Sequence, residues 1–176
     1  MKAATKKTDA NGRHSVEIRP MDIDDLATVF HLGEKLFTSQ DLPNLYRTWD
    51  EFEVVDFFQT DPDLCLVAEV NGRVRGFVLG TTIEKSKSSW KYGYLTWIGV
   101  DPSLKNSGVG KRLLKAFIDA IVEDGARILL VDTEANNAEA LSFFKKMGFG
   151  SPMAHIYLSM NIDSTKRRRK RTGGAP

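Results

Sequence analysis

A glycine-containing loop between an apolar run and an amphipathic helix contains the residue types that could bind a charged ligand. Residues 97–114 read W-I-G-V-D-P-S-L-K-N-S-G-V-G-K-R-L-L, with an expected strand ending at Val100 and an expected helix beginning at Gly108. The first amides of a helix lack intrahelical acceptors and carry the positive end of its dipole, and glycines let the backbone approach a phosphate closely. The loop therefore predicts a phosphate site, and Lys105 and Lys111 reinforce its positive charge.

The spacing of these residues distinguishes between kinds of phosphate-binding loop. A P-loop requires Gly five positions before Gly110 and Ser or Thr at position 112, where this chain has Lys105 and Arg112. A dinucleotide-binding loop requires a third glycine at the position of Leu113. The remaining pattern, K-x-x-G-x-G after V-D-P, resembles the acetyl-CoA loop of the GNAT family of N-acetyltransferases. That loop usually reads Q/R-x-x-G-x-G/A, so Lys105 stands where Gln or Arg is usual.

A second motif follows in the order that this family has. Residues 129–149 read L-L-V-D-T-E-A-N-N-A-E-A-L-S-F-F-K-K-M-G-F. The family has a strand and then N-x-x-A-x-x-x-Y-x-x-x-G-F on the next helix. The matching positions are Asn137, Ala140 or its neighbour Leu141, Phe144, Gly148 and Phe149. With the flanking elements, the resemblance covers residues 16–162.

The hydrophobic pattern predicts an α/β (α+β) fold with a mixed sheet and helices on both faces. Strands are expected at 16–19, 64–70, 74–83, 92–100, 127–132 and 153–161, and helices at 22–37, 48–60, 108–125 and 137–147. The resemblance implies the GNAT-like acyl-CoA N-acyltransferase fold, a splayed central mixed β-sheet flanked by helices. In that fold the strand before the loop diverges from the next strand. Only residues 150–162 remain after the G-F pair, where the family usually has two strands.

Local signals predict how several elements begin and turn. Thr48-x-x-Glu51 is typical of a capping box, and it opens a helix with Phe52, Val55 and Phe58 on its inner face. Asn71-Gly72 predicts a type I′ hairpin between two strands. In the second of these strands, Gly76 and Gly80 indicate bulges or close contacts.

The resemblance implies which residues bind acetyl-CoA. The pyrophosphate would bind the loop, and the pantetheine amides would pair with the preceding strand as an added strand does. One strand amide, near Ile98, would also polarise the thioester carbonyl. The cofactor-binding residues implied are Ile98, Gly99, Val100, Lys105, Asn106, Ser107, Gly108, Val109, Gly110, Lys111, Asn137 and Phe144. Of these, Asn137 is also a natural helix N-cap.

The residues that the family uses for acid–base chemistry are replaced in this chain. The position of its usual base, a Glu on the fourth strand, is Tyr94, and the position of its usual acid, a Tyr, is Phe144. A tyrosine, whose ordinary pKa is about 10, is a poor base near pH 7, so Tyr94 would line the pocket or hold a water. Glu134, just after the fifth strand, is a substitute base or an exposed loop carboxylate. Positioning and oxyanion stabilisation still support direct attack of an amine in a ternary complex.

Composition predicts one domain, 16–162, between a basic disordered segment, 1–15, and a basic disordered tail, 163–176. Residues 1–15 carry a net charge of +3 and residues 166–171 one of +6, which leaves −7 elsewhere in a chain of net charge +2. The single cysteine, Cys65, is expected to be a buried strand thiol in a cytoplasmic protein. No apolar run is long enough to cross a membrane, and three scattered histidines indicate no metal site.

Three hypotheses follow for function. The first is an N-acetyltransferase that uses acetyl-CoA as cosubstrate and acts on a primary amine of a small molecule, a protein N-terminus or a lysine. The second is a catalytically impaired CoA-binding regulatory module, because both expected acid–base residues are replaced. The third is an RNA- or ribosome-associated protein that uses its basic tail to contact nucleic acid. Exposed strand edges near the C-terminus also favour a homodimer.

Overall fold

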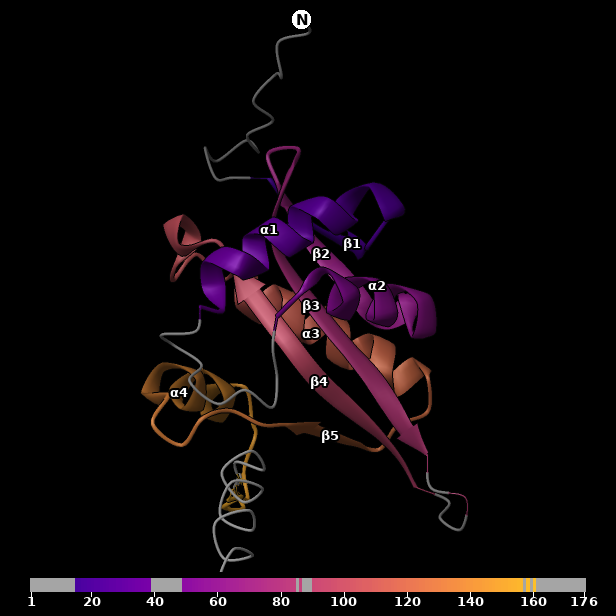
Figure 1. Ribbon diagram of the computed structural model, residues 1–176, viewed down its shortest axis with the longest axis vertical. Helices are drawn as coiled ribbons and strands as arrows, with labels where there is room; N and C mark the ends of the chain where they lie inside the picture. Colours follow the sequence, from indigo (N-terminus) through magenta and orange to yellow (C-terminus); the bar gives the residue numbers. More distant parts are fainter. Residues whose placement is uncertain are drawn as a thin grey trace, which may run out of the picture. The chain divides into compact units, whose positions relative to one another are not determined.

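The computed structural model describes residues 15–38, 49–84, 86, 90–156, 158 and 160, which form two compact units divided after Glu134. The first unit contains a five-stranded sheet of order β1-β2-β3-β4-β5 (Figure 1). Its strands are β1 (Val16–Pro20), β2 (Cys65–Val70), β3 (Arg73–Glu84), β4 (Lys91–Val100) and β5 (Ile128–Val131). Strands β1 to β4 pair antiparallel, and β5 pairs parallel to β4. The mixed sheet confirms the predicted fold class. Residues 1–14 of the predicted basic segment 1–15, and the whole predicted tail 163–176, lie outside the described residues.

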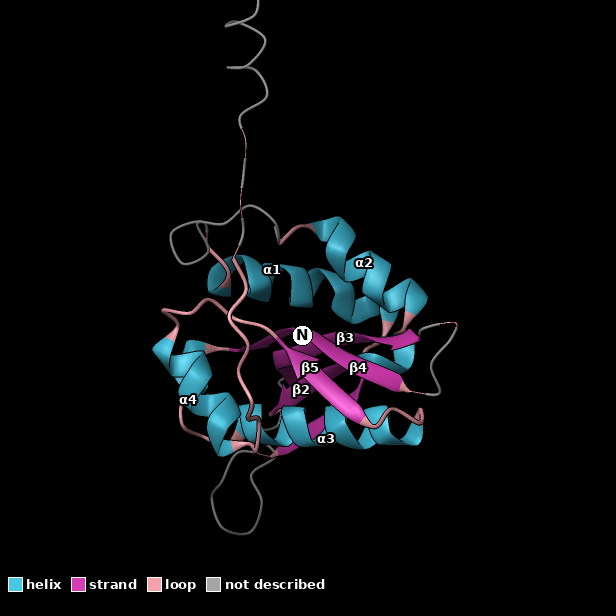
Figure 2. Cartoon of the chain, turned by 90° about the horizontal axis from the view of Figure 1, so that it is seen from below, coloured by secondary structure: helices cyan, strands magenta, loops and turns pink. Residues whose placement is uncertain are grey.

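Helices cover both faces of this sheet. Figure 2 shows α1 (Leu26–Leu36) and α2 (Glu51–Thr60) on one face and α3 (Val109–Glu123) on the other. The buried stripe of α3 consists of Val109, Leu113, Leu114, Phe117 and Ile121. Val122, the residue after Ile121, is 62% exposed, because it lies outside this apolar arc of the helix. No described helix has both the length and the hydropathy that a membrane span requires.

The start of α2 differs from its prediction. Asp50 is the N-cap, and its Oδ1 accepts a hydrogen bond from the Glu53 amide at 2.9 Å. The predicted cap, Thr48, lies outside the described residues. The inner face is only partly as predicted: Phe58 packs against the core, but Phe52 is 74% and Val55 37% exposed, and Val54 is buried instead. Apolar residues occur around most of this helix, so periodicity alone did not select the face that packs on the sheet.

Two glycine predictions are confirmed in the strands. Asn71 and Gly72 both have positive φ, 53° and 77°, as the type I′ hairpin requires. At Gly80 the register between β3 and β4 shifts, and a Cβ there would lie 2.3 Å from Phe117 Cζ. Gly80 therefore lies opposite the bulge and is required for the close approach of α3.

The second unit contains α4 (Ala138–Lys146), followed by Gly148 with φ of 97°. The strand predicted at 153–161 is wrong for the residues described there, which form no strand. Ile156 and Leu158 are 83% and 92% exposed. A single extended segment has no ladder hydrogen bonds of its own, so alternation of apolar residues cannot stabilise it without a partner strand.

Candidate functional site

The candidate site begins where β4 extends past its neighbour β5. The parallel pairing ends at Leu95 opposite Val131, whereas pairing with β3 continues to Val100. Within the described residues, no strand lies on the β5 side of Ile98–Val100. An extended ligand with amide groups could therefore pair with this edge as an added strand. Gly99 has a packing role as well, because a Cβ there would lie 2.6 Å from Leu36 Cδ1 on α1.

A short capped turn connects β4 to the glycine loop. Asp101 Oδ1 accepts hydrogen bonds from the Ser103 amide at 2.9 Å and the Ser103 hydroxyl at 2.6 Å. These bonds hold the pKa of Asp101 below its usual range. Arg75 on β3 contacts both residues, with Nη1 3.5 Å from Asp101 and Nη2 donating to Ser103 Oγ at 3.1 Å. The turn therefore has a stable shape before any ligand binds.

The glycine loop leads into the N-terminus of α3. Gly108 is the N-cap with φ of 84°, and Asn106 has φ of 63°. A Cβ at Gly108 would meet no atom within 4 Å, so the space beside it is open. Glycine has no side chain to cap the helix, and the first-turn amides have no intrahelical acceptors. This arrangement presents backbone donors and a positive dipole end to an anion.

The predicted loop residues contribute in two different ways. The side chains of Lys105, Asn106, Ser107 and Lys111 are exposed at the loop surface. Val109 is 1% exposed and anchors the helix in the core, so only its backbone could contact a ligand.

Tyr94 and Asp132 meet where β4 and β5 diverge. The Tyr94 hydroxyl donates a hydrogen bond to Asp132 Oδ1 at 2.5 Å, and Asp132 directly follows the end of β5. Glu134 lies in the segment after β5, as predicted, but it is half-buried and not fully exposed. Asp132 was not predicted from the sequence, although its place at the end of an expected strand was a usable signal.

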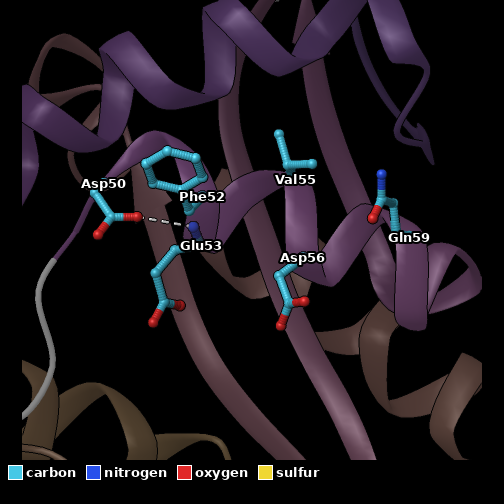
Figure 3. A pocket seen from close by; sticks show the side chains of 6 residues that line it. All are labelled: Asp50, Phe52, Glu53, Val55, Asp56 and Gln59. Atoms are coloured by element: carbon cyan, nitrogen blue, oxygen red, sulfur yellow. Dashed lines mark hydrogen bonds between the residues drawn. The ribbon is translucent and has the colours of Figure 1, made fainter.

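A second carboxylate approaches β4 from α2. Trp97 Nε1 on β4 donates to Glu53 Oε2 at 3.1 Å. Figure 3 shows Glu53 and Asp56 extending to one side of α2, while Phe52 and Val55 extend to the other. The surrounding hollow measures about 420 Å³ and is lined by Asp50, Phe52, Glu53, Val55, Asp56 and Gln59. The sequence analysis missed Glu53 because acidic residues in a first helical turn are common for dipole reasons alone.

The two remaining predicted cofactor residues belong to the second unit. Asn137 caps α4, and its Oδ1 accepts a hydrogen bond from the Ala140 amide at 3.0 Å. Phe144 is 7% exposed, and its ring lies 5.3 Å from those of Phe143 and Phe149. The N-cap interpretation of Asn137 is therefore confirmed, and a cofactor contact by either residue stays a prediction.

The cysteine and the acidic residues do not form a further reactive centre in the described chain. Cys65 is fully buried in β2, as expected, and burial raises the pKa of its thiol to about 12. A buried thiol of this kind is a poor nucleophile. Among the residues that the structure describes, no group of three His, Cys, Asp or Glu side chains is placed to hold a metal ion.

The protein is similar in sequence to N-alpha-acetyltransferases. The N-alpha-acetyltransferase 30 of Homo sapiens is 29% identical over 93 residues, which cover 53% of this chain and 25% of the human protein. This chain therefore spans about a quarter of that relative's length. The protein of the same name from Dictyostelium discoideum is 24% identical over 152 residues, covering 84% of this chain and 80% of that protein.

Solved structures show the same fold. The NatC complex bound to Gag peptide and CoA matches 78% of this chain and 86% of its own, with a TM-score of 0.66 and 19% identity. The aminoglycoside N-acetyltransferase AAC(6')-Iy in complex with CoA matches 84% of this chain and 96% of its own, with a TM-score of 0.65 and 21% identity. The sequence profile described as the acetyltransferase (GNAT) family matches residues 28–149. Because this match spans more than half of the chain, the protein belongs to the acetyltransferase (GNAT) family.

Proposed function

We propose that this chain is an acetyl-CoA-dependent N-acetyltransferase that transfers the acetyl group to a primary amine by direct attack in a ternary complex. One observation supports this most strongly. The β4 edge at Ile98–Val100, which has no described strand beside it, leads through a stable turn to the glycine-capped N-terminus of α3. A strand edge that can pair with amide groups, followed by an anion site at a helix N-terminus, matches a ligand that carries a pantetheine arm and a pyrophosphate.

The proposed binding mode assigns a role to each part of this segment. The amides of Asn106, Gly108 and Gly110 bind the pyrophosphate, since those of Lys105 and Ser107 already donate to Pro102 and Leu104 within the loop. The exposed side chains of Lys105 and Lys111 add positive charge. The backbone of Ile98–Val100 pairs with the pantetheine amides, and the amide near Ile98 stabilises the oxyanion of the tetrahedral intermediate. For Asn137 and Phe144 in the second unit, contact with the cofactor stays an expectation from the family motif.

Acid–base roles for Tyr94 and Glu134 belong to this proposal. The hydrogen bond from Tyr94 to Asp132 orients the phenol at the divergence of β4 and β5, where it would line the acceptor pocket or hold a water. Glu134, three residues after β5, is one carboxylate near the site that could serve in place of the family's usual Glu. Attack on a thioester depends mainly on positioning and on stabilising the oxyanion, so the family's usual Glu and Tyr are not indispensable.

The acceptor is an amine of a peptide N-terminus, a lysine or a small molecule. The NatC structure bound to a peptide and the N-alpha-acetyltransferase relatives favour a peptide α-amine. The aminoglycoside N-acetyltransferase of the same fold favours a small-molecule amine. We further propose a cytoplasmic location, since a lone buried thiol suits a reducing compartment.

The test is release of CoA from acetyl-CoA by purified protein with a panel of peptides, polyamines and aminoglycosides. Turnover with at least one amine, with the acetyl group found on that amine by mass spectrometry, is expected. Tight acetyl-CoA binding with no turnover between pH 6 and 9 would refute catalysis and leave the CoA-binding regulatory module. The replacement of both usual acid–base residues by Tyr94 and Phe144 is what favours that second candidate. Loss of nucleic-acid retention after deletion of residues 164–176 would support a role of the basic tail in contacting RNA or the ribosome.

A further inference from the structure

The Glu53 carboxylate is held against β4 by a buried indole. Trp97 is 4% exposed, and its ring packs 4.7 Å from that of Phe37 and 5.2 Å from that of Trp49. The indole N–H is therefore fixed in direction, and it donates to Glu53 Oε2 at 3.1 Å. At the other end of the residue, the Asp50 cap fixes the Glu53 amide. Both the backbone and the carboxylate of Glu53 are thus restrained.

A bulge in β4 decides which side chains share the face of the sheet under α2. Leu79 pairs with Trp97 but Gly80 pairs with Leu95, so β4 has one extra residue at this point. In the part of β4 that precedes the bulge, Gly93 faces α3, because a Cβ there would lie 2.7 Å from Ile121. Strand alternation then turns Tyr94 toward the opposite face.

In the part of β4 that follows the bulge, odd-numbered residues face the opposite side of the sheet from Gly93. A Cβ at Gly99 would meet Leu36 on α1, so Gly99 and Trp97 face the α1 and α2 side. The partner of Tyr94 in the register, Thr81, faces the same side, since its hydroxyl donates to Asp61 at 2.7 Å. The bulge therefore places Tyr94 and Trp97, three positions apart, on one face. Tyr94 is hydrogen-bonded to the carboxylate of Asp132, and Trp97 is hydrogen-bonded to that of Glu53.

We propose that Glu53 is the catalytic base of the acetyl transfer, a role that rests on the proposed function. Trp97 engages Oε2, and Oε1 has no partner among the described residues. Glu53 lines the hollow beside α2, with Asp50 and Asp56 one turn away on either side. Three carboxylates at this spacing attract an ammonium group, and Trp97 directly precedes the Ile98–Val100 edge assigned to the cosubstrate.

The proton balance of the step is as follows. The ammonium of the acceptor gives one proton to Glu53 Oε1, and the neutral amine nitrogen attacks the thioester carbon. A C–N bond forms while the carbonyl electron pair moves to oxygen, and its return breaks the C–S bond. The thiolate takes the second proton from nitrogen, and Glu53 releases its proton to water. The products are the acetylated amine, CoA thiol and one proton.

The test compares full-length variants with the amine that the wild type acetylates best. Gln at position 53 still accepts the Trp97 hydrogen bond but cannot take a proton, whereas Asp is a base with a shorter reach. Glu53→Gln should lower kcat about 100-fold or more near pH 7. Its thermal stability and its stabilisation by acetyl-CoA should equal those of the wild type. Glu53→Asp should retain more activity than Glu53→Gln. Glu51→Gln, which removes an exposed charge in the same helical turn, should retain wild-type kcat.

The pH dependence gives an independent readout. A free α-amine has a pKa of about 7.7–8.0, so raising the pH to 9 supplies neutral amine and should reduce the defect of Glu53→Gln. Equal or greater activity of Glu53→Gln than of Glu53→Asp would indicate a structural role and overturn the proposal. The proposal is also overturned if Glu134→Gln lowers kcat and Glu53→Gln does not. Absence of turnover in the wild type with every amine would instead overturn the proposed function, and this inference with it.

Discussion

Replacing Gly108 by Glu should abolish stabilisation of the protein by acetyl-CoA. The substitution places bulk and negative charge in the open space beside the α3 N-terminus, where the pyrophosphate would bind. A ligand at about 100 times its Kd stabilises the folded state by about 2.7 kcal/mol. For a chain of this size that corresponds to an increase in Tm of roughly 5–11 °C. Differential scanning fluorimetry with and without acetyl-CoA measures this increase directly.

The chain offers a matched control on the same helix. Gly125, after the C-terminus of α3, has the same φ of 84° and equally open space around an added Cβ. Both substitutions place Glu in the left-handed region, at a cost of roughly 1–2 kcal/mol. At the C-terminus the helix dipole also disfavours a negative charge, so unliganded Gly125→Glu should be the less stable variant.

The two variants should nevertheless respond oppositely to the ligand. Gly125→Glu should keep the full acetyl-CoA shift, and Gly108→Glu should show none. A wild-type shift in Gly108→Glu would refute the loop as the pyrophosphate site. Loss of the shift in both variants would show that strain, and not the local charge, is responsible.

Two further predictions concern stability. Asp25 is 7% exposed and accepts hydrogen bonds from Arg19 at 2.6 and 3.0 Å, so Asp25→Asn should lower the free energy of unfolding by about 2 kcal/mol at pH 7, measured by urea denaturation. Arg19 holds the pKa of Asp25 in the folded protein below its ordinary value of 3.8, so the unfolded state binds more protons at acidic pH. The contribution of ionised Asp25 to the free energy of unfolding is therefore complete above pH 3.8 and disappears as the pH falls through the folded pKa. An unchanged difference between the two proteins at pH 3 would contradict this assignment. Phe117→Ala should lower the free energy of unfolding by about 3–5 kcal/mol, because the Phe117 side chain is fully buried. Val122 is 62% exposed on the same helix, so Val122→Ala should lower it by about 0.5 kcal/mol or less. Similar losses of stability in the two variants would contradict the observed buried face of α3.

The elements predicted most accurately are those specified by local chemistry. The Asn71-Gly72 turn, the Gly108 helix start and the Asn137 cap depend on backbone conformations or short hydrogen bonds that neighbouring residues provide. Errors occurred where a choice depended on distant partners. On α2, Val54 is buried and Phe52 is exposed, and the described residues between 153 and 160 form no strand although apolar residues alternate there.

The sequence by itself determined the order of elements as far as α4, the glycine loop and the family motifs, because each is specified within a few consecutive residues. Only the tertiary structure decided which side chains meet at the candidate site. The bulge in β4 reverses strand alternation, so that Tyr94 and Trp97 share a face that strict alternation would separate. The contacts of Trp97 with Glu53 and of Tyr94 with Asp132 join residues 44 and 38 positions apart. Their spacing along the chain contains no signal for such contacts, because they depend on the register of strands and the placement of a helix across the sheet.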